Sequence, residues 1–237
     1  MVTFLYRVYL ILVVLPLFVV VTILTAVATA IGSILGGARI FSYYPGKVWS
    51  RITLWLLLCP VTVRGKEYAE SGRSYIVTPN HSSSIDIFVM YGYFDRPFKW
   101  VMKGALRKIP IVGWACEKAG FIFVNLAKPM EVVRYAEMAI KDGYSIMIFP
   151  EGTRSADGKV TRLKKGAFRI AADTGAHILP AYITGAHEVL PKHGFWPTRR
   201  RLELTFYPPI DPKEADSDVM TLLRSVERTL GSAENAK

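Results

Sequence analysis

Residues 78–88 read TPNHSSSIDIF and place a histidine, three serines and an aspartate between two apolar segments. The residues that lead into this stretch, Tyr75–Thr78, have the short apolar pattern of a buried strand. The residues that follow it have the pattern of a helix. In an α/β sheet, a polar loop that follows the carboxyl end of a strand is a common place for a ligand site.

Short apolar segments alternate with helical patterns from residue 61 onward. The predicted strands are Val61–Arg64, Tyr75–Thr78, Lys99–Met102, Phe121–Val124, Ile146–Phe149, Ile178–Ile183 and Arg201–Tyr207. The clearest predicted helices are Pro129–Asp142, Leu163–Thr174 and Asp216–Leu230. This alternation predicts an α/β domain with a mostly parallel central sheet flanked by helices. The tail after Gly231 is expected to fray.

The first 63 residues differ from the rest in charge and hydropathy. Their charged residues are Arg7, Arg39, Lys47 and Arg51, and all 19 acidic residues of the chain lie beyond them. Val8–Leu35 contains no charged residue, and as a helix it would extend about 42 Å, more than the ~30 Å hydrocarbon core of a bilayer. We therefore predict two parts, membrane-anchoring helices in residues 1–63 and a second domain in residues 64–237.

Several details of this membrane segment follow from its residues. Pro16 is expected to kink the helix, and Gly32, Gly36 and Gly37 are expected to end it. The second apolar stretch, Ile52–Val63, is too short to span a bilayer. It is predicted to form an interfacial or re-entrant helix, with Trp49 and Trp55 near the lipid headgroups.

The cations flanking the long apolar run predict its orientation. Arg7 precedes the run, whereas Arg39, Lys47 and Arg51 follow it, which places residues 64–237 on the cytoplasmic side of the inner membrane. The alternative is a signal peptide cleaved near Ala28–Ala30, but the apolar run is long for one.

The net charge of +11 suits anionic partners such as lipid headgroups, phosphates or an acidic carrier protein. The runs Leu163–Lys165 and Thr198–Arg201 are candidates for such contacts, or simply solvated charge runs. No nucleic-acid-binding motif is present, so a nucleic-acid partner is not predicted. Cys59 and Cys116 lie in apolar surroundings without metal-site spacing, and no metal is predicted.

The first polar cluster, Asn80–Asp86, offers a base and a carboxylate. His81 and Asp86 can meet only if His81 lies in the loop and Asp86 in the first turn of the following helix, since five residues span about 140° around a helix. A carboxylate on one imidazole nitrogen leaves the other as a base that can deprotonate an alcohol. The alternative is a capping box made by Ser83 and Asp86, with His81 incidental.

The second polar cluster, Phe149–Ser155, follows another predicted strand. Its Arg154 offers a planar fork for a phosphate, and Gly152 and Thr153 suit a turn that adds donors. The alternative is an ordinary turn in which Arg154 pairs with Glu151. Lys103 also follows a strand and is a second phosphate candidate, or an ordinary exposed lysine.

Other catalytic signatures are absent from the sequence. No GxSxG nucleophile elbow, P-loop or GxGxxG motif occurs. The run His187–His193 superficially resembles a zinc-protease helix, but its spacing is wrong and Pro191 would break the helix.

The two polar clusters together resemble the glycerolipid acyltransferase family, and in particular its bacterial lysophosphatidate acyltransferases. Four blocks match in order: NHxxxxD at 80–86, a middle block at 103–123, FPEGTRS at 149–155 and ILPA at 178–181. The resemblance implies transfer of a fatty acyl group from acyl-CoA or acyl-carrier protein to a lysophosphatidate hydroxyl. It implies no cofactor beyond that co-substrate and no covalent acyl-enzyme.

The resemblance also implies roles for the residues. His81 would be the general base and Asp86 its orienting partner, while Lys103 and Arg154 would hold the acceptor phosphate. Gly152 and Thr153 would shape that pocket, with Glu151 in support.

One departure from the family pattern concerns the acceptor. Leu126 stands where many members carry an arginine, and the next cation is Lys128. The alternatives are therefore transfer to another acceptor, such as glycerol-3-phosphate, a lyso-ornithine lipid or another lysophospholipid, or a noncatalytic membrane lipid-binding protein.

Overall fold

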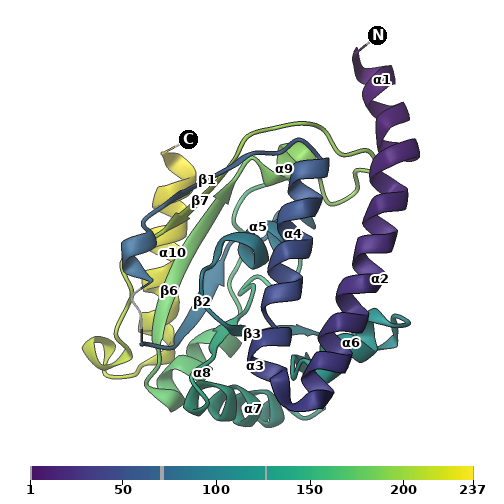
Figure 1. Ribbon diagram of the computed structural model, residues 1–237. Helices are drawn as coiled ribbons and strands as arrows, with labels where there is room; N and C mark the ends of the chain where they lie inside the picture. The colour runs from purple at the N-terminus through teal and green to yellow at the C-terminus, as the bar shows by residue number, and fades with distance from the viewer. Residues whose placement is uncertain (1, 70–71, 126, 237) are drawn as a thin grey trace.

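The computed structural model describes residues 2–69, 72–125 and 127–236. Within these ranges, seven strands form one sheet in the order β1-β7-β6-β2-β5-β3-β4 (Figure 1). Every neighbouring pair is parallel except β6 with β7. The strands are β1 Val61–Arg64, β2 Tyr75–Pro79, β3 Phe98–Lys103, β4 Ile122–Val124, β5 Ser145–Met147, β6 His177–Thr184 and β7 Leu202–Phe206. The predicted α/β class with a mostly parallel sheet is confirmed.

Helices cover both faces of the sheet. They are α1 Val2–Tyr9, α2 Leu15–Gly32, α3 Ala38–Phe41, α4 Tyr44–Leu56, α5 Ile85–Tyr93, α6 Val112–Lys118, α7 Pro129–Lys141, α8 Gly166–Thr174, α9 Ala186–Val189 and α10 Val219–Asn235. Short 3₁₀ turns lie at Lys66–Tyr68, Gly104–Lys108 and Pro212–Ala215, and π-helical turns lie at Leu10–Val14 and Ser33–Gly37.

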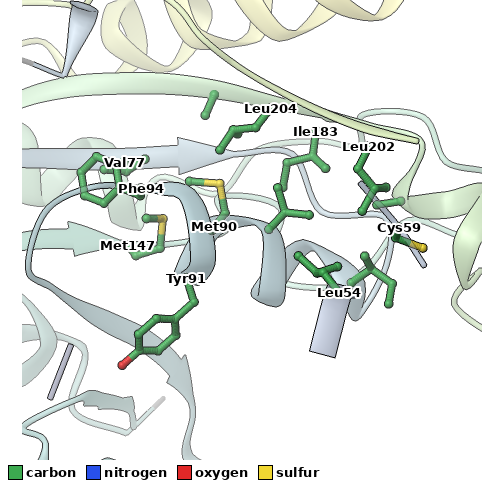
Figure 2. Close-up of a cluster of buried hydrophobic side chains, with 14 of the residues drawn as sticks. Leu54, Cys59, Val77, Met90, Tyr91, Phe94, Met147, Ile183, Leu202 and Leu204 are labelled. Carbon is green, nitrogen blue, oxygen red and sulfur yellow. The ribbon is translucent and has the colours of Figure 1, made fainter. Parts of the chain in front are cut away.

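Alternation along the central strand β2 divides the core into two layers. Tyr75 and Val77 pack with α4 and α5 on one face, whereas Ile76 packs with α7, α8 and α10 on the other. Figure 2 shows part of the first layer, in which Val77, Met90 and Phe94 lie near Leu204. Both faces are covered, so every residue of β2 is buried, as expected for a central parallel strand.

The N-terminal helix is long and apolar enough, from Thr3 to Phe41, to cross a membrane. It lies along the flank of the domain: Tyr6 and Tyr9 donate hydrogen bonds to backbone carbonyls at the end of α4, and the Trp49 indole donates to Thr22 Oγ1 at 2.9 Å. The predicted kink at Pro16 is replaced by the π-helical turn Leu10–Val14, which accommodates the missing N–H of the proline. The left-handed Gly36 ends the helical run before α3.

The prediction of an interfacial helix over Ile52–Val63 is wrong. Helix α4 ends at Leu56, and Val61 begins the edge strand β1 instead. Leu54 and Leu56 are buried in the core, so the apolar residues pack on the protein. The Trp49 ring contacts the Phe18 and Phe88 rings, while Trp55 is exposed. The predicted boundary between residues 63 and 64 falls inside β1, and the division into parts stays a prediction.

The C-terminal tail is helical rather than frayed. Helix α10 continues through Gly231 to Asn235 because Ala233 is buried and Glu234 accepts a hydrogen bond from the Val160 backbone. At the other end of this helix, Asp218 caps the backbone N–H of Thr221.

Candidate active site

The carboxyl ends of the adjacent parallel strands β2, β5 and β3 meet at one edge of the sheet. His81 follows β2, Phe149 follows β5, and Lys103 ends β3. The polar segments that the sequence places after separate strands therefore form one site, as the topology of a parallel sheet requires.

His81 lies in the loop after β2, and Asp86 lies in the first turn of α5. The imidazole Nδ1 is 2.9 Å from Asp86 Oδ2. The Asp86 side chain is fully buried, whereas 14% of the His81 side chain is exposed. With Nδ1 held by the carboxylate, Nε2 is the nitrogen available to accept a proton.

Asp86 also fixes the loop that carries His81. Its Oδ2 accepts hydrogen bonds from the backbone N–H groups of Ser82 and Ser83, each at 2.8 Å, while Ser83 Oγ accepts from the Ile85 N–H. The contact from Asp86 back to Ser83 is half of a capping box. The Asp86 carboxylate therefore makes both of the predicted contacts, the one to Ser83 and the one to His81.

A second set of contacts holds His81 from the loop after β5. Its imidazole stacks on the Phe149 ring, with centroids 3.8 Å apart and planes at 11°, and Phe149 stacks in turn on Trp100. The backbone N–H of His81 donates to Glu151 Oε1 at 2.6 Å, and its carbonyl accepts from Ser155 N–H. The stacking could not be read from the sequence, since residues 81 and 149 meet only in the tertiary structure.

Glu151 is a buried organiser of this loop. Its other oxygen accepts from both the backbone N–H and the hydroxyl of Thr161, at 2.9 and 2.6 Å. Burial raises the pKa of this carboxyl, against the pull of these hydrogen bonds. The predicted pairing of Arg154 with Glu151 is wrong, because Arg154 Nη1 instead donates to Ser84 Oγ at 2.9 Å.

His81 is part of the lining of a groove of about 1240 Å³, which we call the catalytic groove. Its polar lining includes four of the predicted residues, Lys103, Gly152, Thr153 and Arg154, together with Lys164. The remainder is largely apolar and extends toward α2, α6 and α7. A base beside cations and a long apolar surface can hold an anionic headgroup and an acyl chain at once.

Two further residues of this edge have clear positions. Asn80 exchanges side-chain hydrogen bonds with the backbone of Ile183, which ties the end of β2 to β6. Lys128 is exposed and pairs with Glu131 at 3.4 Å. Leu126, at the position where the sequence departs from the family pattern, lies outside the described residues. Among the described residues, no group of His, Cys, Asp and Glu could hold a metal ion.

The family model for acyltransferases matches residues 60–184, which include every one of these site residues. The chain belongs to the acyltransferase family.

Two relatives of the chain have the same activity in their names. The chain is 31% identical, over 65% of its length, to the chloroplastic 1-acyl-sn-glycerol-3-phosphate acyltransferase LPAT1 of Arabidopsis thaliana, and the match covers 44% of that protein. It is also 31% identical to a 1-acyl-sn-glycerol-3-phosphate acyltransferase of Borreliella burgdorferi, over 68% of this chain and 66% of that one. The chain thus spans less than half of the plant relative.

The fold of this acyltransferase also matches a solved structure. The crystal structure of the 1-acyl-sn-glycerophosphate acyltransferase PlsC from Thermotoga maritima aligns with a TM-score of 0.71 and 32% sequence identity. The alignment covers 79% of this chain and 76% of that one. The expected family and fold are therefore confirmed.

Proposed function

We propose that this chain transfers a fatty acyl group from a thioester donor to the sn-2 hydroxyl of lysophosphatidate, giving phosphatidate. The observation that carries the proposal is that His81, paired with Asp86, lines a groove with cations and a largely apolar remainder. The names of its relatives support the same acceptor.

The proposed chemistry needs a single base. His81 Nε2 takes the proton of the acceptor hydroxyl as its oxygen attacks the thioester carbonyl, and Asp86 stabilises the imidazolium that forms. The new C–O bond replaces the C–S bond, and the imidazolium returns the proton to the leaving thiolate. No acyl-enzyme is formed, so no nucleophilic side chain is required.

The cations have a separate role in this proposal. Arg154, held by Ser84, and Lys103, at the end of β3, bind the acceptor phosphate beside the base. Glu151 is a positioning residue, because it is buried and bonded to His81 and Thr161. Gly152 and Thr153 form the wall of the phosphate site.

We also propose that the long apolar helix holds the protein at the membrane, with the domain on the cytoplasmic side. Arg39 donates to the Asp142 carbonyl, and Lys47 pairs with Asp95. These contacts support a position of the domain on the same side of the membrane as the cations that follow the helix. The apolar residues on the outer side of the helix, such as Leu12, Leu24 and Leu35, are exposed and available to lipid.

The test compares wild type, His81→Ala and the control His177→Ala in membranes. The control histidine begins β6, at the amino ends of the parallel strands, whereas His81 lies at their carboxyl ends. Acyl-CoA and acyl-carrier protein are supplied as donors, with lysophosphatidate, glycerol-3-phosphate or a phosphate-free monoacylglycerol as acceptor. We expect transfer to lysophosphatidate that falls about 10²- to 10⁴-fold in His81→Ala alone.

Other results of this assay would change the proposal. Full turnover in His81→Ala would remove this residue from the mechanism. Preference for a different acceptor would leave the proposed acyl-transfer chemistry in place and change the identity of the acceptor. Absence of transfer with both donors and every acceptor would favour a lipid-binding protein.

A further inference from the structure

A second groove, of about 630 Å³, lies between the segment that precedes α8 and one face of α10. The segment contributes Arg162, Lys164 and Lys165, and the helix contributes Met220, Leu223 and Arg224. The α10 residues are three and four positions apart, so they share one face of the helix. We call this the basic groove; it combines cations with an apolar floor.

The cations of the basic groove are not neutralised within the part of the chain that the structure describes. None of Arg162, Lys164, Lys165 and Arg224 has a carboxylate within ion-pair distance there. Glu227 is the acid in the lining. A ligand with several phosphate charges suits this surface.

Lys164 joins the basic groove to the catalytic groove, since it lines both. Its backbone N–H donates to the Pro150 carbonyl at 2.8 Å. Its side chain crosses Gly152 so closely that a Cβ there would stand 2.6 Å from Nζ and 2.9 Å from Cε. Glycine at 152 therefore leaves room for the Lys164 side chain along the loop after β5, and Lys164 is a residue that a ligand in either groove can contact.

The position of the basic groove favours a soluble ligand over a lipid headgroup. Helices α8 and α10 pack on one face of the sheet, whereas α4 and α5 pack on the other, together with Leu10 and Val14 of the apolar N-terminal helix. In Figure 1, α10 and α2 accordingly lie on opposite sides of the molecule. A phosphate that reaches the basic groove thus comes from the side of the domain away from this helix.

We propose that the basic groove binds the nucleotide end of an acyl-CoA donor. The phosphates lie on Lys165 and Arg224, the adenine lies on Met220 and Leu223, and the pantetheine arm passes Lys164 into the catalytic groove. This inference rests on the proposed acyl transfer and assigns its donor and the donor's entry side.

The test uses the full chain with Arg224→Gln and Lys165→Gln, singly and combined. The control is Arg228→Gln, an exposed cation on α10 outside the groove lining. Both target side chains are exposed, and thermal unfolding verifies that the variants fold. We expect the KM for acyl-CoA to rise about tenfold or more in the double variant. The KM for lysophosphatidate and turnover of S-acyl-pantetheine, which lacks the nucleotide and phosphates, should match wild type.

Binding of CoA itself separates this inference from the proposed activity. Titration calorimetry should show weaker CoA binding in the double variant than in Arg228→Gln, and weaker binding of dephospho-CoA than CoA to wild type, whether or not acyl transfer occurs. Unchanged CoA binding and acyl-CoA KM in the double variant would overturn the proposal. If the KM rose only for acyl-carrier protein as donor, the basic groove would bind a carrier protein rather than the nucleotide of CoA. A loss of binding to anionic vesicles alone would make the groove a membrane contact.

Discussion

The two polar loops at the carboxyl edge of the sheet are held in place differently. In the loop after β2, Asp86 accepts from His81, Ser82 and Ser83, all within five residues of it. The loop after β5 is held by distant partners: Glu151 by Thr161 and His81, and Arg154 by Ser84. A loop closed by its own residues can be deduced from their spacing, whereas one closed by distant residues cannot.

The largest effect is expected in the locally closed loop, from Asp86→Asn. An amide oxygen can keep the hydrogen bonds from Ser82 and Ser83, so the loop keeps its shape while the charge that stabilises the imidazolium is lost. We expect kcat to fall about 10³-fold or more, with a modestly lower Tm because the amide NH2 takes the place of Oδ1, which is buried without a hydrogen-bond partner among the described residues. Rates at saturating substrates and thermal unfolding test this, and a loss below tenfold would mean that the carboxylate only caps α5.

Arg154→Gln tests the loop held by distant contacts. Removing a charge-assisted contact to the acceptor phosphate should raise the KM for lysophosphatidate about tenfold or more. Ser84→Ala, which removes the hydroxyl that holds Arg154, should give a smaller rise in the same parameter. Steady-state kinetics with lysophosphatidate and monoacylglycerol provide the comparison. An equal loss with the phosphate-free acceptor would contradict phosphate binding.

Glu151→Gln tests whether that loop depends on a buried acceptor. The amide group would face either the His81 or the Thr161 N–H, which leaves donors unpaired and should lower the free energy of unfolding by about 1–2 kcal/mol. Denaturant titrations of both proteins would measure it. A variant as stable as wild type at neutral pH would show that those hydrogen bonds contribute little.

Wild type and Glu151→Gln should also differ in how their stability depends on pH. Because burial raises the pKa of Glu151 above its ordinary value of 4.5, the folded state binds a proton more readily than the unfolded chain. The contribution of this carboxyl to stability therefore falls as pH rises from 4.5 through the raised folded pKa. The stability advantage of wild type over Glu151→Gln should be larger at the acidic end of this window.

The smallest effect is expected from Phe149→Leu, which removes the contact between the two loops. Loss of the stacked ring should lower stability by about 0.5–1.5 kcal/mol beyond the effect of reduced area and lower kcat several-fold. His81 stays bonded to Asp86, so the pH–rate profile should keep its shape. Stopped assays across pH would test this, and a loss as large as that of Asp86→Asn would show that stacking, not the carboxylate, orients the imidazole.

Local patterns predicted most of the fold. The strands β1 to β7 lie within one or two residues of their predicted positions because short apolar segments fit buried parallel strands. Helix α7 begins at Pro129 and ends just before Gly143 for equally local reasons. Where prediction failed, as for Ile52–Val63, the apolar residues had two possible destinations, membrane or core. Composition alone does not separate these, because both exclude water.

The sequence by itself determined how His81 and Asp86 could meet, since NHxxxxD can pair only across a loop–helix junction, and the structure shows that they do. Only the tertiary structure decided what surrounds them: the Phe149 ring on His81, the burial of Glu151 and the path of Lys164 over Gly152. The physical reason is the range of the contacts. Backbone geometry fixes neighbours within one turn, whereas contacts between residues 70 positions apart depend on the order and register of the parallel strands.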